Sequence, residues 1–203
     1  MKPDHQTSHG DSGGGVFVVD DESVVALGLQ AMLAQIGRDR VHVFANAEDA
    51  LARLDELRPD VILMDIRLGD GMDGLAAARE VMERRPCPVI ITTAYAEERF
   101  LDEAMQSHVF GYLVKPITSR QLASAIAVAR SRFEQFQRLQ TENVSLRDAL
   151  ETRKLVERAK GLLMDKKGLT ELAAYELMRT QSQQQSRPMR DVARQVIEAS
   201  EFL

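Results

Sequence analysis

The sequence predicts a doubly wound α/β domain with a five-stranded parallel sheet, followed by an all-α connector helix and a three-helix bundle. Short apolar runs alternate five times with helical patterns over residues 16–135, and such runs are typical of buried parallel strands. No Gly or Pro interrupts residues 118–160, which favours one long helix there. Two further helical patterns follow Gly168 and indicate a small bundle.

Turn-forming residues such as Gly37 and Pro59 separate the predicted elements. Strands are expected near residues 16–19, 41–44, 61–64, 88–91 and 110–114. Helices are expected near residues 23–36, 47–57, 73–85, 96–107 and 119–135. Five strand–helix units in this order produce a doubly wound sheet with right-handed crossovers.

Composition places the chain among globular proteins and excludes a disulfide-rich or membrane-spanning class. Cys87 is the single cysteine, and we interpret it as an inert, small apolar residue. No apolar run approaches the roughly 18 residues that a bilayer requires, and the polar N-terminus does not resemble a signal peptide. We therefore expect a cytoplasmic protein without a membrane partner.

Charge is distributed unevenly along the chain. Residues 1–125 carry 12 basic and 20 acidic side chains, a net charge of −8, whereas residues 126–203 carry 14 basic and 11 acidic ones, a net charge of +3. An acidic half joined to a basic half indicates cation binding in the first and a polyanion partner for the second. A charge of +3 also fits a merely solvated helical surface.

Polar side chains follow four of the predicted strands at the point where each ends. Asp20 and Asp21 follow the first, Asp65 the third, Thr93 the fourth and Lys115 the fifth. Chemistry collects at the carboxyl ends of the strands in an open parallel sheet. Three carboxylates, a hydroxyl and an ammonium in one crevice indicate a site for a divalent cation and a phosphoryl group.

These residues, in this order, resemble the receiver domain of two-component response regulators, which has a flavodoxin-like fold. The resemblance implies that Asp65 accepts a phosphoryl group from a sensor histidine kinase. It also implies a Mg²⁺ ion bound directly by Asp21, through water by Asp20, and by Asp65 and the backbone carbonyl of Arg67. The only reactions expected are this phosphorylation and slow self-dephosphorylation, so we do not expect a classical enzyme.

The same resemblance assigns roles to three further residues. Thr93 would donate its hydroxyl to a phosphoryl oxygen, and Lys115 would pair with another oxygen, its position set by a cis bond to Pro116. Tyr112 resembles the aromatic residue that swings inward on activation; the alternative is a half-exposed packing tyrosine. Phosphorylation is expected to change self-association, with a homodimer in the phosphorylated form.

The long helix carries a short heptad pattern. Phe136, Asn143 and Leu150 recur every seven residues, as do Leu139 and Leu146, and they fit the a and d positions of a coiled coil. The alternative is a single amphipathic helix that lies on its own domain. The expected division is a disordered tail over residues 1–15, a receiver over 16–130, a connector over 131–150 and a bundle over 151–203.

The segment RKLVERAKGLLMDKKGLTELAAYELMR resembles the ANTAR domain, an RNA-binding three-helix module. This resemblance implies binding to paired RNA hairpins and prevention of premature transcription termination. In the bundle, Thr170 is a plausible N-cap. The expected core consists of Leu155, Ala159, Leu162, Leu163, Leu172, Ala173, Leu177, Val192, Val196 and Ile197.

Basic side chains in the last segment are candidates for RNA contacts because they can neutralise phosphates. The candidates are Arg153, Arg158, Lys160, Lys166, Lys167, Arg179, Arg187 and Arg190. Tyr175 is either a stacking platform for a base or a core residue. The leading hypothesis is a phosphorylation-controlled RNA-binding antiterminator. The alternatives are a receiver-controlled protein-interaction module and a DNA-binding transcriptional regulator.

Overall fold

The computed structural model of the chain describes residues 15–94 and 109–201. It separates into two compact units, one ending at Phe136 and the other beginning at Gln137. The predicted tail, apart from Gly15, and the predicted helix over residues 96–107 lie outside the described residues. The four-segment division expected from the sequence stays a prediction.

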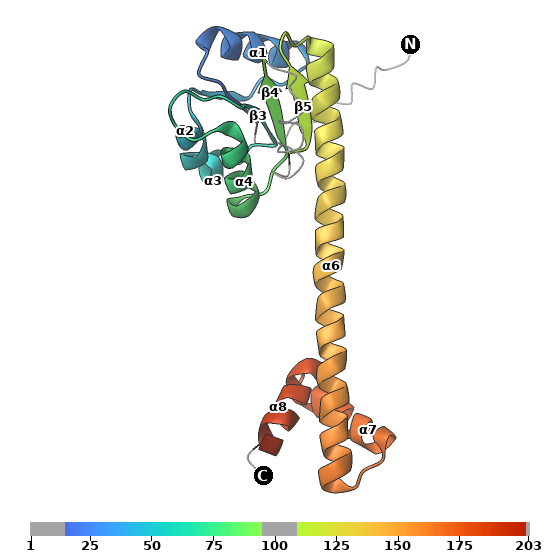
Figure 1. The fold of residues 1–203 in the computed structure, drawn as a ribbon. Helices are drawn as coiled ribbons and strands as arrows, with labels where there is room; N and C mark the ends of the chain where they lie inside the picture. Colours follow the sequence, from blue (N-terminus) through green and yellow to red (C-terminus); the bar gives the residue numbers. More distant parts are fainter. Residues whose placement is uncertain (1–14, 95–108, 202–203) are drawn as a thin grey trace, which may run out of the picture. The chain divides into compact units, whose positions relative to one another are not determined.

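The first unit contains the predicted five-stranded parallel sheet (Figure 1). Its strands pair in the order β2-β1-β3-β4-β5, and every pair is parallel. They are β1 Val16–Val19, β2 Val41–Phe44, β3 Val61–Asp65, β4 Val89–Thr93 and β5 Gly111–Val114. The predicted fold class is confirmed, and Asp65 and Thr93 are the last residues of their strands rather than the residues after them.

Helices cover both faces of the sheet. Helix α1 (Ser23–Gln35) and the first turns of α6 (Ser119–Lys167) pack on one face, whereas α2 (Ala47–Ala52), α3 (Leu54–Leu57) and α4 (Gly74–Arg84) pack on the other (Figure 1). The single helix predicted over residues 47–57 was wrong. It breaks at Arg53, because the Arg53 amide bonds to the carbonyl of Ala50, three residues earlier, and tightens the last turn of α2.

Alternation along the strands decides which side chains share a face. Val61 and Leu63 of β3 belong to the cluster under α1 and α6, whereas Ile62 and Met64 belong to the cluster under α2, α3 and α4. Side chains alternate between the faces of a strand, so Asp65 lies on the α1–α6 side. We call this side the α1 face and the opposite one the α4 face.

Helix α6 runs without interruption through Gly161. Its residues 137–151 are all exposed, including the heptad residues Leu139, Leu146 and Leu150. The alternative of an amphipathic helix that lies on its own domain stays a prediction. Among the described residues, no helix has the length and apolar character that crossing a membrane requires.

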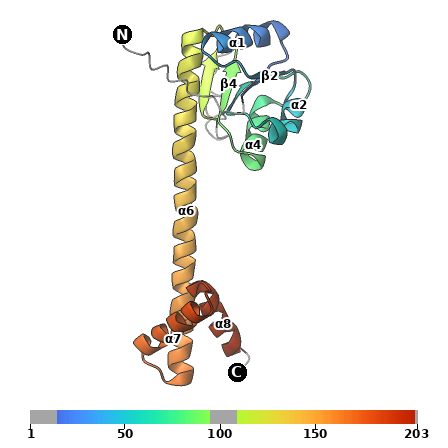
Figure 2. The same cartoon turned by 180° about the vertical axis from the view of Figure 1, so that it is seen from behind.

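The second unit packs the end of α6 against α7 (Glu171–Gln184) and α8 (Met189–Glu201) (Figure 2). The predicted N-cap is confirmed, since the Thr170 hydroxyl accepts a hydrogen bond from the Ala173 amide at 3.3 Å. The core consists of Ala159, Leu163, Ala174, Met178, Val192, Ala193 and Ile197, with Leu155, Val156, Leu162, Leu169, Met189 and Val196 partly buried around it.

The predicted core residues of α7 were wrong. Leu172 is 72% exposed, Leu177 is 37% exposed and Ala173 is exposed. Ala174 and Met178 are fully buried instead. They are four residues apart and therefore share one stripe of the helix, and this stripe, rather than the more hydrophobic leucines, faces α6 and α8.

Candidate functional site

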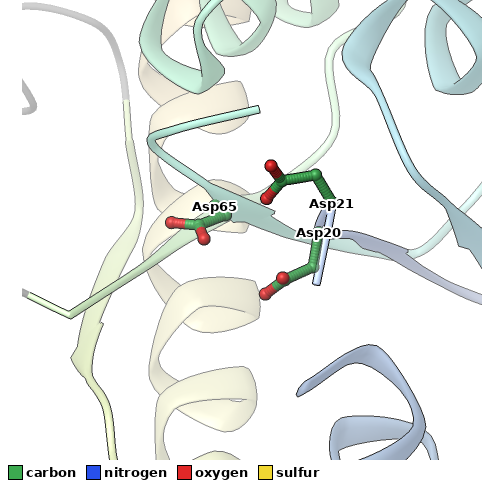
Figure 3. Close-up of side chains that lie close together, drawn as sticks. All are labelled: Asp20, Asp21 and Asp65. Atoms are coloured by element: carbon green, nitrogen blue, oxygen red, sulfur yellow. The ribbon is translucent and has the colours of Figure 1, made fainter. Parts of the chain in front are cut away.

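Three acidic side chains are gathered at the carboxyl ends of β1 and β3 (Figure 3). Carboxylate oxygens of Asp20, Asp21 and Asp65 all lie within 4.8 Å of one another. Asp20 and Asp65 are buried, whereas Asp21 is exposed. The pairing of Val19 with Met64 places Asp20 beside Asp65, so the parallel register itself brings together two residues 45 positions apart in the sequence.

Lys115 joins two of these carboxylates. Its ammonium lies 2.8 Å from Asp20 Oδ2 and 2.8 Å from Asp65 Oδ2. The Lys115 amide also donates to the carbonyl of Thr93 at 2.8 Å, and the bond to Pro116 is cis, as the sequence predicts. The predicted cluster of acids and ammonium is therefore assembled from β1, β3 and the end of β5.

Burial and the ion pairs shift the pKa values of Asp20 and Lys115. Burial raises the pKa of Asp20 above its ordinary value, although hydrogen bonds from Lys115 and the Glu22 amide oppose the shift. Burial by itself would lower the pKa of Lys115, but its hydrogen bonds to Asp20 and Asp65 outweigh that effect and raise the pKa. Lys115 therefore remains an ammonium at neutral pH and supplies the counter-charge for the buried acids.

Thr93 and Tyr112 lie on the α4 face of the sheet. Thr93 ends β4 and is buried, and it shares a face with Val89 and Ile91. Tyr112 of β5 is half-buried against the same cluster. These two residues therefore share a face of the sheet, and their roles stay predictions. Arg67 is exposed, two residues after Asp65.

Gly74 at the start of α4 and Glu48 of α2 hold the connection between β3 and α4 in place, and the sequence pattern did not indicate either residue. A Cβ built on Gly74 would overlap the backbone carbonyl of Asp65, so only glycine fits there. Glu48 of α2 accepts a hydrogen bond from the Met72 amide at 2.8 Å, which holds the loop and lowers the pKa of Glu48. For Gly74 the available sequence signal was its place directly after Asp73, which caps α4. Glu48 had no such signal, because 24 residues separate it from Met72.

The cluster fits a hard divalent cation. Carboxylate oxygens are the ligands that Mg²⁺ prefers, and Mg²⁺ takes one or two protein carboxylates together with waters. Asp21 is exposed and can bind an ion without displacing an internal partner, whereas Asp20 and Asp65 each share an oxygen with Lys115. The donor set is therefore suitable, and Lys115 competes with a cation for two of its members.

The predicted RNA-contacting side chains do not share one environment. Lys160 is only 8% exposed, and its ammonium lies 2.7 Å from Glu171 and 2.9 Å from Glu157. The hydrogen bond to Glu171 is the main cause of a raised pKa for Lys160, and the pKa of Glu171 is lowered in turn. Lys160 therefore links α6 to the first turn of α7.

Four other candidates have partners inside the second unit. Lys166 donates to the carbonyl of Ser200, and Arg187 donates to Gln195 at 3.3 Å. Arg179 pairs with Glu176 at 3.4 Å and Arg190 with Asp148 at 3.8 Å. Arg153, Arg158 and Lys167 are exposed on α6, and Arg153 and Lys167 form no ion pair with any described residue. Tyr175 is 40% exposed and lies outside the buried cluster, which favours the surface interpretation of this residue.

Two family models match this chain. The model of the response regulator receiver domain matches residues 16–127, and the model of the ANTAR domain matches residues 145–197. The chain is 34% identical over 183 residues to the transcriptional regulatory protein PdtaR of Mycobacterium tuberculosis, an alignment that covers 90% of this chain and 89% of that protein. It is 40% identical over 116 residues to the positive alginate biosynthesis regulatory protein of Pseudomonas aeruginosa, which covers 56% of this chain and 46% of that protein.

Solved structures resemble the first unit. The signal receiver domain of a modulated diguanylate cyclase from Desulfovibrio desulfuricans superposes with a TM-score of 0.56 at 31% identity, covering 60% of this chain and 96% of that one. A CheY-like receiver domain from Methanospirillum hungatei gives a TM-score of 0.54 at 25% identity, covering 59% of this chain and 95% of that one.

Proposed function

This chain belongs to the two-component response regulators, with a receiver domain followed by an ANTAR domain, and from this premise we propose that phosphorylation of Asp65 controls dimerisation and RNA binding. The observation that carries the proposal is the cluster of Asp20, Asp21 and Asp65 with Lys115 bridging two of its members. The output is transcription antitermination in the cytoplasm.

Asp65 accepts the phosphoryl group from a histidine kinase. A carboxylate oxygen of Asp65 bonds to phosphorus while the bond from phosphorus to the kinase histidine breaks, and the histidine nitrogen keeps the electron pair. Mg²⁺, held by Asp20, Asp21, Asp65 and the backbone carbonyl of Arg67, would neutralise charge on the incoming group. Water later attacks phosphorus slowly, the bond between phosphorus and the Asp65 oxygen breaks, and inorganic phosphate leaves while Asp65 regains its carboxylate.

Phosphorylation changes the groups to which Lys115 and Thr93 bond. Lys115 exchanges Asp65 for a phosphoryl oxygen, and Thr93 donates its hydroxyl to another. The phosphoryl group brings about −1.5 to −2 charge and strong acceptor oxygens, so these contacts differ in strength between the two states and shift their populations. Tyr112, on the face that Thr93 shares, follows the hydroxyl inward and changes the surface near β5 and the start of α6.

The receiver surface and α6 together support dimerisation. Leu139, Leu146 and Leu150 are 66%, 63% and 54% exposed, and they follow the heptad spacing on α6. A parallel partner helix would cover them and place Asn143 opposite its copy, where a polar a position specifies register and a two-stranded state. The occupant of this stripe is therefore a second copy of the chain.

RNA binding is assigned to the ANTAR bundle, and its phosphate contacts to the exposed cations Arg153, Arg158 and Lys167. Lys160 receives a positioning role in this proposal, since its ammonium already bridges Glu157 and Glu171. Two bundles in a dimer would hold two hairpins at once, which links the coiled coil to RNA affinity through effective concentration.

The test combines self-association and RNA capture. The full chain is incubated with Mg²⁺ and beryllofluoride, a phosphoryl mimic, and its mass is measured by light scattering. RNA is then captured from a cell lysate by the wild type and by Asp65→Ala, and the bound RNA is sequenced. The proposal predicts a doubled mass with beryllofluoride and enrichment of terminator-adjacent hairpins that weakens in Asp65→Ala.

Three outcomes would contradict the proposal. An unchanged mass with beryllofluoride removes the phosphorylation-dependent dimer. Equal binding of hairpin RNA and duplex DNA supports a DNA-binding regulator instead. Absence of any nucleic acid in the capture supports a receiver-controlled protein-interaction module.

A further inference from the structure

Thr92 has a buried hydroxyl whose role is not explained by the sheet. The residue is 1% exposed, and its Oγ1 has no hydrogen-bond partner among the residues that the structure describes. A buried polar atom left unpaired costs free energy, and native structures contain few of them. Valine would fill the same space in β4 without that cost, so a hydroxyl at this position suggests a role outside the resting state.

The sheet register places Thr92 next to the acceptor. Asp65 of β3 pairs directly with Thr92 of β4. Thr92 follows Ile90 by two residues, and Ile90 belongs to the cluster of the α1 face, so alternation places Thr92 on that face. Asp65 lies on the same face, whereas Thr93 lies on the other. Strand β4 therefore carries two hydroxyls at its end, one on each face.

Lys115 reaches the acids from the far side of β4 in the resting state. Strand β4 lies between β5 and β3, yet the Lys115 ammonium reaches Asp65 on β3 and Asp20 on β1 at 2.8 Å each. The Lys115 side chain must therefore span the width of β4 on the α1 face, the face on which Thr92 lies. While Lys115 holds Asp65 Oδ2, that oxygen already has a strong donor.

We propose that Thr92 is a positioning residue for Asp65, whose hydroxyl donates to the Asp65 oxygen that Lys115 releases when it turns to a phosphoryl oxygen. This inference rests on the proposed phosphorylation of Asp65. An unpaired hydroxyl in the resting state and a paired one in the phosphorylated state favour the second state over the first. Thr92 thus stabilises the phosphorylated receiver at the expense of the resting one.

The test compares Thr92→Val, which keeps the shape and removes the hydroxyl, with Thr92→Ser, which keeps the hydroxyl. Calorimetry measures the affinity of the full chain for beryllofluoride in excess Mg²⁺, and separately for Mg²⁺ alone. Thr92→Val should raise the beryllofluoride Kd about fivefold, the equivalent of one ordinary hydrogen bond. Thr92→Ser should stay within about twofold of the wild type, and Mg²⁺ affinity should not change in either variant.

The resting state provides a second readout. Thr92→Val should melt at the same temperature as the wild type or higher without beryllofluoride, because it removes an unpaired buried hydroxyl. Ile90→Val, on the same face of β4, is the matched control and should lower stability without changing the beryllofluoride Kd. The inference is overturned if Thr92→Val binds beryllofluoride like the wild type, if Thr92→Ser is equally impaired, or if Mg²⁺ affinity falls in parallel. A wild type that binds no beryllofluoride would overturn the proposed function together with this inference.

Discussion

Gly74, the first residue of α4, lies directly against the backbone carbonyl of Asp65, and its amide donates to the next carbonyl, that of Ile66, at 2.9 Å. A side chain at Gly74 would overlap the Asp65 carbonyl oxygen. The start of α4 is thereby held against the end of β3, and the position of the acceptor depends on a residue that carries no chemistry.

Replacement of Gly74 by alanine should destabilise the receiver. The new Cβ meets backbone, which can move only together with β3 or α4, so we expect a loss of about 3 kcal/mol, the upper end of the usual cost, in the free energy of unfolding. Gly28→Ala is the matched control. Nothing lies within 4 Å of a Cβ at Gly28, and this helical position should gain about 0.5–1 kcal/mol. Urea denaturation of both variants measures the difference, and equal stability of the two would contradict the prediction.

Removal of the Lys115 ammonium should raise the affinity of the receiver for Mg²⁺ and lower its affinity for beryllofluoride. Lys115→Met frees oxygens of Asp20 and Asp65 and removes a positive charge beside them, so Mg²⁺ should bind about tenfold more tightly or better. Beryllofluoride should bind more weakly, because its fluorine atoms lose their cationic partner. Calorimetric titrations with Mg²⁺, then with beryllofluoride in saturating Mg²⁺, separate the two effects. Weaker Mg²⁺ binding in Lys115→Met would show that the ammonium does not compete with the metal.

The burial register of α7 can be tested with one buried and one exposed residue. Met178 is fully buried in the second unit, whereas Leu172 is 72% exposed. Met178→Ala should cost about 2–5 kcal/mol because it leaves a cavity, and Leu172→Ala should stay within about 0.5 kcal/mol of the wild type. Thermal and urea unfolding followed by circular dichroism provide the comparison. A larger loss of stability for Leu172→Ala than for Met178→Ala would contradict this burial and support the core that the sequence pattern predicts.

Cys87 should be unreactive in the folded protein. Burial raises the pKa of its thiol to about 12 from 9.0. The folded state therefore holds this proton more tightly than the unfolded state, and the resulting stabilisation is present below pH 9 and is lost as the pH rises toward 12. At pH 8 a thiol reagent such as DTNB should label Cys87 rapidly in guanidinium chloride and far more slowly in buffer. Equal labelling rates in the two solutions would show that the thiol is accessible.

The contribution of the heptad positions of α6 to dimerisation can be distinguished from an effect of any exposed apolar residue. Leu146 is on the stripe and Val144 is off it, although both are well exposed, at 63% and 59%. Leu146→Ser removes two buried leucines from each dimer, one per copy, and should weaken dimerisation in Mg²⁺ and beryllofluoride about tenfold or more. Val144→Ser should leave it unchanged. Sedimentation equilibrium measures both constants, and an equal effect of the two substitutions would place the interface elsewhere.

Much of the receiver could be predicted because its pattern is local. Four- and five-residue apolar runs and the residues that end them predicted five parallel strands and brought Asp20, Asp65, Thr93 and Lys115 to one edge. The helix over residues 47–57 was predicted as one element because its apolar period continues through the break. The break at Arg53 depends on a single backbone hydrogen bond, and no side-chain pattern reports it.

The bundle was harder to predict because three helices share one small core. Hydrophobicity alone favoured Leu172 and Leu177, yet Ala174 and Met178 face the partners. A small residue permits close approach of helices, and its burial depends on the facing surface rather than on its own apolar character. The burial of Lys160 likewise depends on the facing helix. The sequence pattern indicated a surface cation, whereas its ammonium pairs with Glu157 and Glu171.

The order of strands and helices, the residues at the strand ends and the uninterrupted course of α6 follow from the amino-acid sequence by itself, because each depends on the periodicity of near neighbours. Packing alone decided the rest: Lys115 reaches across β4 to Asp20 and Asp65, Thr92 rather than Thr93 lies on their side of the sheet, and Gly74 touches the acceptor strand. These relationships join residues far apart in the sequence, and their geometry exists only once strand register and helix contacts have been set.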